Sequence, residues 1–182
     1  KGDILEKSLR HFLGEVCLED LSIRFGCNAV DLVSGREVCF TSGPLYRALR
    51  ASAAYPLLID PACFQRSFMV DGGLLNNVPI NLARQLGAAR VLVPDIHRLL
   101  PKMPAAKLKS NLAVIFRLIQ IVLADSTDSR LPAADLLINI NPSVDTFDFT
   151  QTKRLVSLGQ KVTQTKIRAI KNMISKAGQA EA

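Results

Sequence analysis

The stretch "SFMVDGG" places an acid where it could do chemistry. Residues 67–71 have the pattern of a short β-strand, Asp71 stands at its end, and Gly72 and Gly73 follow. Open α/β sheets bind ligands beyond the carboxyl ends of their strands, and glycine permits positive φ and a close approach of backbone or ligand. A carboxylate here could accept a proton from a nucleophile, position a water or hold a metal. It could equally cap its own turn through backbone hydrogen bonds.

The elements that must position this acid alternate between helical and strand periods, which is typical of an α/β architecture. Helices are predicted over 5–16, 45–54, 79–86, 105–125 and 148–176. Strands are predicted over 21–32, 37–40, 67–71, 89–96 and 135–140, the first two joined by a Ser34-Gly35 turn. No segment has the composition of a linker, so residues 1–182 are expected to form one domain.

The composition allows one proper core, with 48% hydrophobic and 21% charged residues. The apolar stretch 112–124 is interrupted by Arg117 and Gln120 and is too short to span a bilayer. No signal peptide is present, and the chain begins at Lys1 without a methionine, which suggests a fragment or a processed product. A cytoplasmic or peripheral membrane location is expected.

Four cysteines, Cys17, Cys27, Cys39 and Cys63, lie among apolar neighbours without a C-x-x-C pair. This pattern favours buried free thiols in a reducing compartment over disulfides or a metal site. With only two histidines, zinc has few candidate ligands. Neither a metal nor a cofactor is expected, since dinucleotide and P-loop glycine motifs are also absent from the sequence.

The net charge of +7 is concentrated at the end of the chain, because residues 151–182 hold seven basic residues against Glu181 alone. A solvated helix face explains this distribution, and so does a patch that favours an anionic membrane or a nucleic acid. Aromatic residues make up 5% and do not alternate with the basic ones, which argues against a nucleic-acid partner. Helix 105–125 has two interpretations as well, a core helix or a flap that touches lipid.

Two longer stretches resemble the second half of a patatin-like phospholipase domain. They are "RASAAYPLLIDP" (50–61) and "FMVDGGLLNNVPINLARQLGAARVLV" (68–93). Segments upstream and downstream resemble the family in the same order, although Leu57 stands where a glycine is common. The resemblance implies a three-layer α/β/α patatin-like (acyl-hydrolase) fold, with the N-terminal part of the domain missing from this chain.

The family's active site is a Ser-Asp dyad, so the resemblance implies that Asp71 is the general base, with Gly72 and Gly73 as its supporting motif. It would take the proton of the serine as the hydroxyl attacks an acyl ester, and then activate water. An ordinary aspartate, with a pKa of about 3.9, is a feeble base. A dry, apolar pocket would raise that pKa.

The nucleophile motif of the family, G-x-S-x-G, does not occur in this chain, and neither does the glycine-rich oxyanion loop. Ser42 and Ser52 both fail the pattern. Both missing parts are expected upstream of Lys1 or on a second chain. His97 follows a predicted strand, as the histidine of a Ser…Asp…His triad would, but the resemblance needs no histidine.

We therefore interpret the chain as part of an acyl-ester hydrolase acting on phospholipids, lysophospholipids or related acyl lipids. It supplies the Asp and not the Ser, and alone it would be inactive. Expected partners are the acyl-lipid substrate, an anionic membrane contacted peripherally, and the segment or chain that carries the serine. The alternative is a non-catalytic patatin-like interaction or lipid-binding module, which the missing nucleophile favours.

Overall fold

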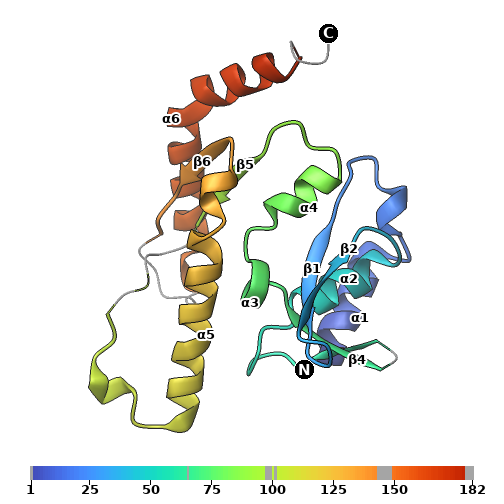
Figure 1. The fold of residues 1–182 in the computed structure, drawn as a ribbon, viewed down its shortest axis with the longest axis vertical. Coiled ribbons are helices and arrows are strands. Elements are labelled where there is room, and N and C mark those ends of the chain that lie inside the picture. The colour runs from blue at the N-terminus through green and yellow to red at the C-terminus, as the bar shows by residue number, and fades with distance from the viewer. Residues whose placement is uncertain (1, 65, 97–99, 101, 143–148, 179–182) are drawn as a thin grey trace.

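The computed structural model describes residues 2–64, 66–96, 100, 102–142 and 149–178 (Figure 1). Its α-helices are α1 (Gly2–Leu13), α2 (Leu45–Ser52), α3 (Gly73–Asn76), α4 (Ile80–Gln85), α5 (Asn111–Asp128) and α6 (Thr152–Gly178). Its strands are β1 (Cys27–Asp31), β2 (Arg36–Phe40), β3 (Ala62–Phe64), β4 (Ser67–Asp71), β5 (Leu92–Asp95) and β6 (Leu136–Asn139). Short 3-10 helices cover Leu18–Asp20, Ala105–Lys107, Leu131–Ala133 and Phe149–Gln151.

Four of these strands form an antiparallel sheet in the order β2-β1-β4-β3. The predicted hairpin joins β1 to β2, where Gly35 adopts a φ of 67° and Asp31 pairs with Arg36. Strand β4 pairs with β1, so that Asp71 lies opposite Ala29. Because β4 runs antiparallel to both neighbours, the ligand-binding rule for parallel sheets that drew attention to its end does not apply to it.

Helices cover both faces of this sheet, as an α/β/α layering requires. Successive side chains of β1 point to opposite faces, so Ala29 packs against Ala51 of α2 while Asn28 faces α3. Helix α1 packs on the outer side of α2, and α5 packs on α3. The α/β class predicted from the sequence is confirmed.

The other two strands, β5 and β6, form a separate parallel pair. A second apolar cluster joins this pair to the preceding helix through Ile80, Val91 and Val93. Helix α6 lies along β6 (Figure 1). The sequence predicts both strands to be buried on two faces, but Pro94 and Asn139 are exposed, so that prediction is wrong for these positions.

The structure changes some predicted boundaries. The strand expected over 21–32 begins only at Cys27, and the helix expected from 105 begins as a separate 3-10 turn before α5 starts at Asn111. Ser110 caps α5, its hydroxyl accepting a hydrogen bond from the Ala113 N–H at 3.2 Å. The short strand β3 is absent from the sequence-based prediction.

All four cysteines are free thiols, and their burial differs from the prediction. Cys27 is buried and Cys17 half-buried, whereas Cys39 and Cys63 are exposed. Burial raises the pKa of the Cys27 thiol to about 11, against a hydrogen bond with Ser52 that lowers it. Among the described residues, no helix is long and apolar enough to cross a membrane, and no cluster of metal-ligating side chains occurs.

Candidate active site

Asp71 is held in place by the backbone on both sides of β4. Its residue lies opposite Ala29 of β1, and its N–H donates to the carbonyl oxygen of Ala54 at 3.1 Å, just after α2. The chain then turns at once into the short helix α3. The strand predicted over 67–71 is confirmed to the residue, and it fixes the position of the carboxylate at the end of β4.

The carboxylate of Asp71 is half-buried and takes part in its own turn. Its Oδ1 accepts a hydrogen bond from the Gly73 N–H at 2.8 Å. Burial raises the pKa of this carboxyl group, and the hydrogen bond from Gly73 opposes the rise. The pKa of the nearby Tyr55 phenol is raised by its own burial and also by the negative charge of Asp71. The local environment therefore makes Asp71 a stronger base than an exposed aspartate.

Positions 72 and 73 need glycine because a Cβ would clash with neighbouring atoms, and not because the backbone has a positive φ there. Gly72 has a φ of −64°, which any residue adopts. A Cβ there would lie 2.5 Å from the carbonyl oxygen of Asn28. A Cβ on Gly73 would lie 2.6 Å from Oδ1 of Asn77 and 2.8 Å from Cδ2 of Leu123. The close approach expected of the two glycines is present, but a positive φ is not.

A buried amide network fixes α3 beneath the acid. Asn76 is fully buried, and its Nδ2 donates to Oε1 of Glu37 at 2.8 Å and to Oδ1 of Asn81 at 2.9 Å. Asn28 Nδ2 donates to the same Glu37 oxygen and to the carbonyl oxygen of Asn76, both at 2.8 Å. Oδ1 of Asn76 has no partner within the described part of the chain. These polar groups tie the segment after Asp71 to β1 and β2.

A second set of hydrogen bonds joins the site to α5. The Asn77 N–H donates to the Ser126 hydroxyl at 3.0 Å, and Asn77 Nδ2 donates to Oγ1 of Thr127 at 2.7 Å. The Thr127 hydroxyl in turn donates to the carbonyl oxygen of Leu123. Sequence reasoning missed these residues, because Asn77 has only the local pattern of a turn and its partners lie about fifty positions away.

Among the residues that the structure describes, no serine hydroxyl contacts the Asp71 carboxylate. The hydrogen bond that this carboxylate accepts comes from the Gly73 N–H. Ser52 lies instead next to the thiol of Cys27, and Ser126 is buried against Asn77. His97 lies outside the described residues. His11 is exposed on α1.

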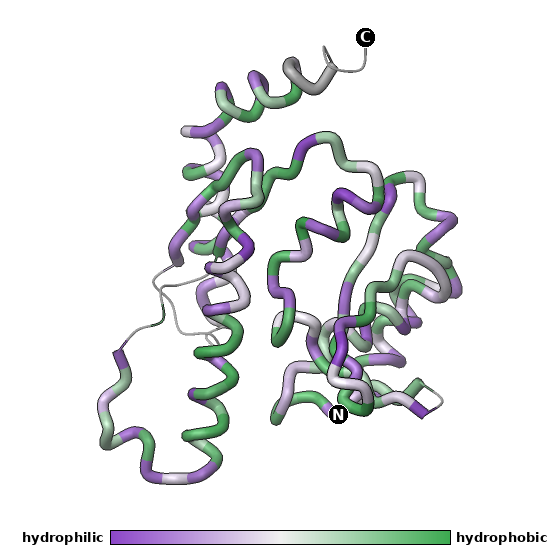
Figure 2. Tube along the Cα trace, in the orientation of Figure 1, coloured by the Kyte–Doolittle hydropathy of each residue, from purple (hydrophilic) through white to green (hydrophobic). Residues whose placement is uncertain are grey.

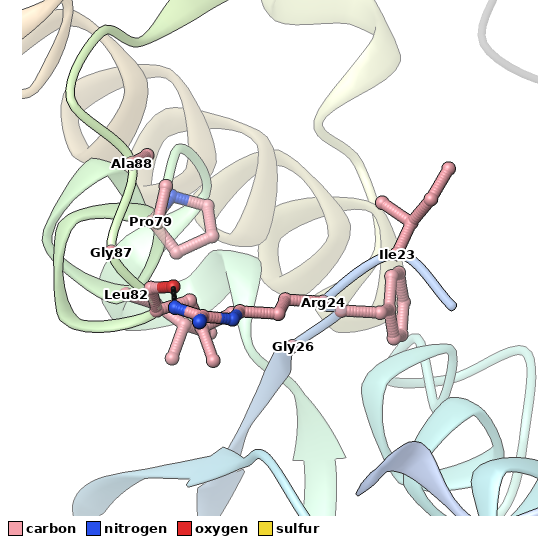
Figure 3. A pocket seen from close by; sticks show the side chains of 10 residues that line it. Ile23, Arg24, Gly26, Pro79, Leu82, Gly87 and Ala88 are labelled. Atoms are coloured by element: carbon pink, nitrogen blue, oxygen red, sulfur yellow. Dashed lines mark hydrogen bonds between the residues drawn. The ribbon is translucent and has the colours of Figure 1, made fainter. Parts of the chain in front are cut away.

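A pocket of about 580 Å³ lies apart from the acid, between the segment before β1 and helix α4 (Figure 3). Arg24 extends across it and donates to the Leu86 carbonyl oxygen at 2.8 Å. Leu82 and Gly26 form part of the wall, which includes neither Asp71 nor the two glycines that follow. The half-buried acid therefore lies outside this pocket.

Comparison with known proteins gives one family match and several curated relatives. Residues 1–84, which include Asp71 and its glycines, match the family described as patatin-like phospholipase. The lysophospholipase NTE1 of Pyricularia oryzae is 30% identical over 105 residues, 58% of this chain and 7% of that protein. An uncharacterized NTE family protein of Mycobacterium tuberculosis is 31% identical over 98 residues, 54% of this chain and 17% of the relative.

The lysophospholipase nte1 of Neurospora crassa is 29% identical over 105 residues, again 58% of this chain and 7% of the relative. The chain therefore spans less than a fifth of the length of each of these relatives. The predicted family resemblance is confirmed over the matched residues.

Proposed function

With its first 84 residues matched to the patatin-like phospholipase family, we propose that this chain supplies the general base of a serine acyl hydrolase. The substrates are phospholipids, lysophospholipids or related acyl lipids. The observation that carries the proposal is the half-buried Asp71 at the end of β4, whose carboxyl pKa is raised by burial. The names of the fungal relatives support a lysophospholipid among the substrates.

In the proposed reaction, ionised Asp71 accepts the proton of a serine hydroxyl as its oxygen attacks the acyl carbonyl. Protonated Asp71 passes this proton to the departing alcohol of the lipid and is ionised again. It then accepts a proton from the water that hydrolyses the acyl-enzyme, and returns that proton to the serine oxygen as the fatty acid leaves. The serine and the oxyanion donors come from a segment outside this chain, within the same protein or on a second one. The N–H of Gly73 keeps the carboxylate oriented before the proton arrives.

The test is hydrolysis of a lysophospholipid and of a short-chain p-nitrophenyl ester by the assembled protein, meaning this chain joined to the segment that carries the serine. Asp71→Asn should abolish activity, while the matched variant Asp20→Asn, at an exposed position on a 3-10 helix, should leave it unchanged. The 182-residue chain alone should be inactive. Activity that survives Asp71→Asn would return this carboxylate to a turn-capping role.

A second candidate is a non-catalytic interaction or lipid-binding module. The hydrogen bond from Gly73 favours it, because a turn aspartate without catalytic duty makes the same contact. A serine-reactive fluorophosphonate separates the two, since only an assembled protein with an activated serine is labelled. Absence of labelling in a folded assembly would favour the module.

A further inference from the structure

Helix α5 carries apolar side chains on two opposite faces. Its inner face packs on the candidate site: the Phe116 ring lies 6.2 Å from the Tyr55 ring, and Cδ2 of Leu123 lies 2.8 Å from the place that a Cβ on Gly73 would take. Its outer face is a stripe spaced i, i+1, i+4, i+7 and i+8, which lie on one side of a helix. The stripe is Val114, Ile115, Leu118, Ile121 and Val122, each between 39% and 54% exposed.

Positive charge precedes this stripe along the chain. Three exposed lysines stand just before α5, namely Lys102, Lys107 and Lys109. A further basic residue, Arg117, belongs to helix α5 itself. No acidic residue occurs between 102 and 124, and the first is Asp125. Figure 2 shows the strongly apolar character of most of α5, next to hydrophilic residues in the segment that leads into it. An apolar stripe beside basic side chains is complementary to an anionic lipid surface.

We propose that the outer face of α5 docks the protein on an anionic membrane, with the helix lying in the plane of the interface. No helix among the described residues could span a bilayer, and in-plane binding needs only the exposed stripe and the lysines. This surface rests on the proposed function in one respect, the choice of lipid as the occupant. Because the inner face contacts Tyr55 and the neighbourhood of Gly73, docking through the outer face would leave the candidate site about one helix diameter, roughly 10 Å, from the membrane surface.

Helix α6 is the competing surface on this chain, since it carries most of the net charge. Its exposed apolar residues are sparse, with Val156, Ile167 and Ile174 spread over nineteen positions. The stripe on α5 places five within nine positions. Helix α6 therefore supplies matched controls, because Val156 and Ile167 are 55% and 47% exposed, against 54% and 45% for Leu118 and Val122.

The experiment is co-sedimentation of the full chain with vesicles of equal parts phosphatidylcholine and phosphatidylglycerol, compared with phosphatidylcholine alone. The double variant Leu118→Ser/Val122→Ser should bind the anionic vesicles about tenfold more weakly. The control Val156→Ser/Ile167→Ser should bind like the unsubstituted chain. Circular dichroism should show unchanged helicity in both, because all four positions are exposed.

A second pair of variants tests the charge. Lys107→Gln/Lys109→Gln should weaken binding and flatten its salt dependence, while Lys166→Gln/Lys171→Gln on α6 should do so less. Equal losses from α5 and α6 variants, or equal binding to both vesicle types, would overturn the proposal. Self-association that Leu118→Ser/Val122→Ser abolishes, without vesicle binding, would instead assign the stripe to a second copy of the chain.

The outcome is separable from the proposed function. Asp71→Asn should bind vesicles like the unsubstituted chain whether or not the assembly hydrolyses lipid. Vesicle binding through α5 by a folded assembly that hydrolyses no ester would refute the hydrolase and keep the docking surface. Hydrolysis of a soluble p-nitrophenyl ester, with no vesicle binding, would refute the docking surface and keep the hydrolase.

Discussion

Alanine substitutions at two glycines should change stability in opposite directions. A Cβ on Gly72 would lie 2.5 Å from the backbone oxygen of Asn28, which β1 holds in its ladder and which cannot move as a side chain can. Such overpacking costs about 1–3 kcal/mol. The lower entropy of alanine in the unfolded chain offsets about 0.4–1 kcal/mol, so Gly72→Ala should destabilise by up to about 2.5 kcal/mol.

Gly159 is the matched control, because it lies within α6 and a Cβ there would meet no atom within 4 Å. Its replacement by alanine should stabilise by up to about 1 kcal/mol. For a chain of this length, about 2–4 °C of unfolding midpoint corresponds to each kcal/mol. The midpoint should therefore fall for Gly72→Ala and rise for Gly159→Ala.

The assay is thermal unfolding followed by far-ultraviolet circular dichroism, with urea unfolding of the same proteins as a second measure. In the assembled protein, Gly72→Ala should also lower esterase activity, because the displaced turn carries Asp71. A stabilised Gly72→Ala protein would refute the reasoning. The glycine would then serve neither as a close-contact position nor as a support for the acid.

Three further predictions concern the site and its surroundings. Asp71→Asn should raise the unfolding midpoint at neutral pH, because burial disfavours the carboxylate and raises its native pKa above 3.8. The gain should begin to fall as acid protonates the native group and should vanish below pH 3.8, where the unfolded chain is protonated too; a constant gain at every pH would contradict this. Thr127→Val should cost about 0.5–1.5 kcal/mol in urea unfolding, because Asn77 loses its acceptor; no loss would refute that bond's role. The Val91 N–H, then Arg90 and Arg84, lower the pKa of Asp135 to about 2, so Asp135→Asn should destabilise above pH 3.8. That effect should fade between pH 3.8 and about 2, and a pH-independent effect would count against it.

Sequence reasoning succeeded where the determinants are local. The strand ending at Asp71, the hairpin at Gly35 and the helix from Leu45 each depend on residues within a few positions, and each is present. The need for small residues at positions 72 and 73 was also predictable, although the reason given included a positive φ that the structure does not use.

Sequence reasoning failed where distant residues decide. Strand β3 spans only Ala62–Phe64, too short for any periodicity, and it forms because β4 provides a partner. The antiparallel direction of β4 cannot be deduced from a period of two. The bonds from Asn77 to α5 and from Asn76 to Glu37 depend on folding that no local pattern reveals. The exposure of Cys39 and Cys63 likewise depends on which strand face is covered.

The separation of the two sheets has a consequence for local unfolding. Since β5 and β6 pair only with each other among the described strands, their amide hydrogens need not exchange with solvent in the same opening event as those of β1 and β4. The link between the halves of the chain includes the Asn77 bonds to α5. Native-state hydrogen exchange would then divide the protein into two cooperative units. The unit around Asp71 could stay closed while the parallel pair opens.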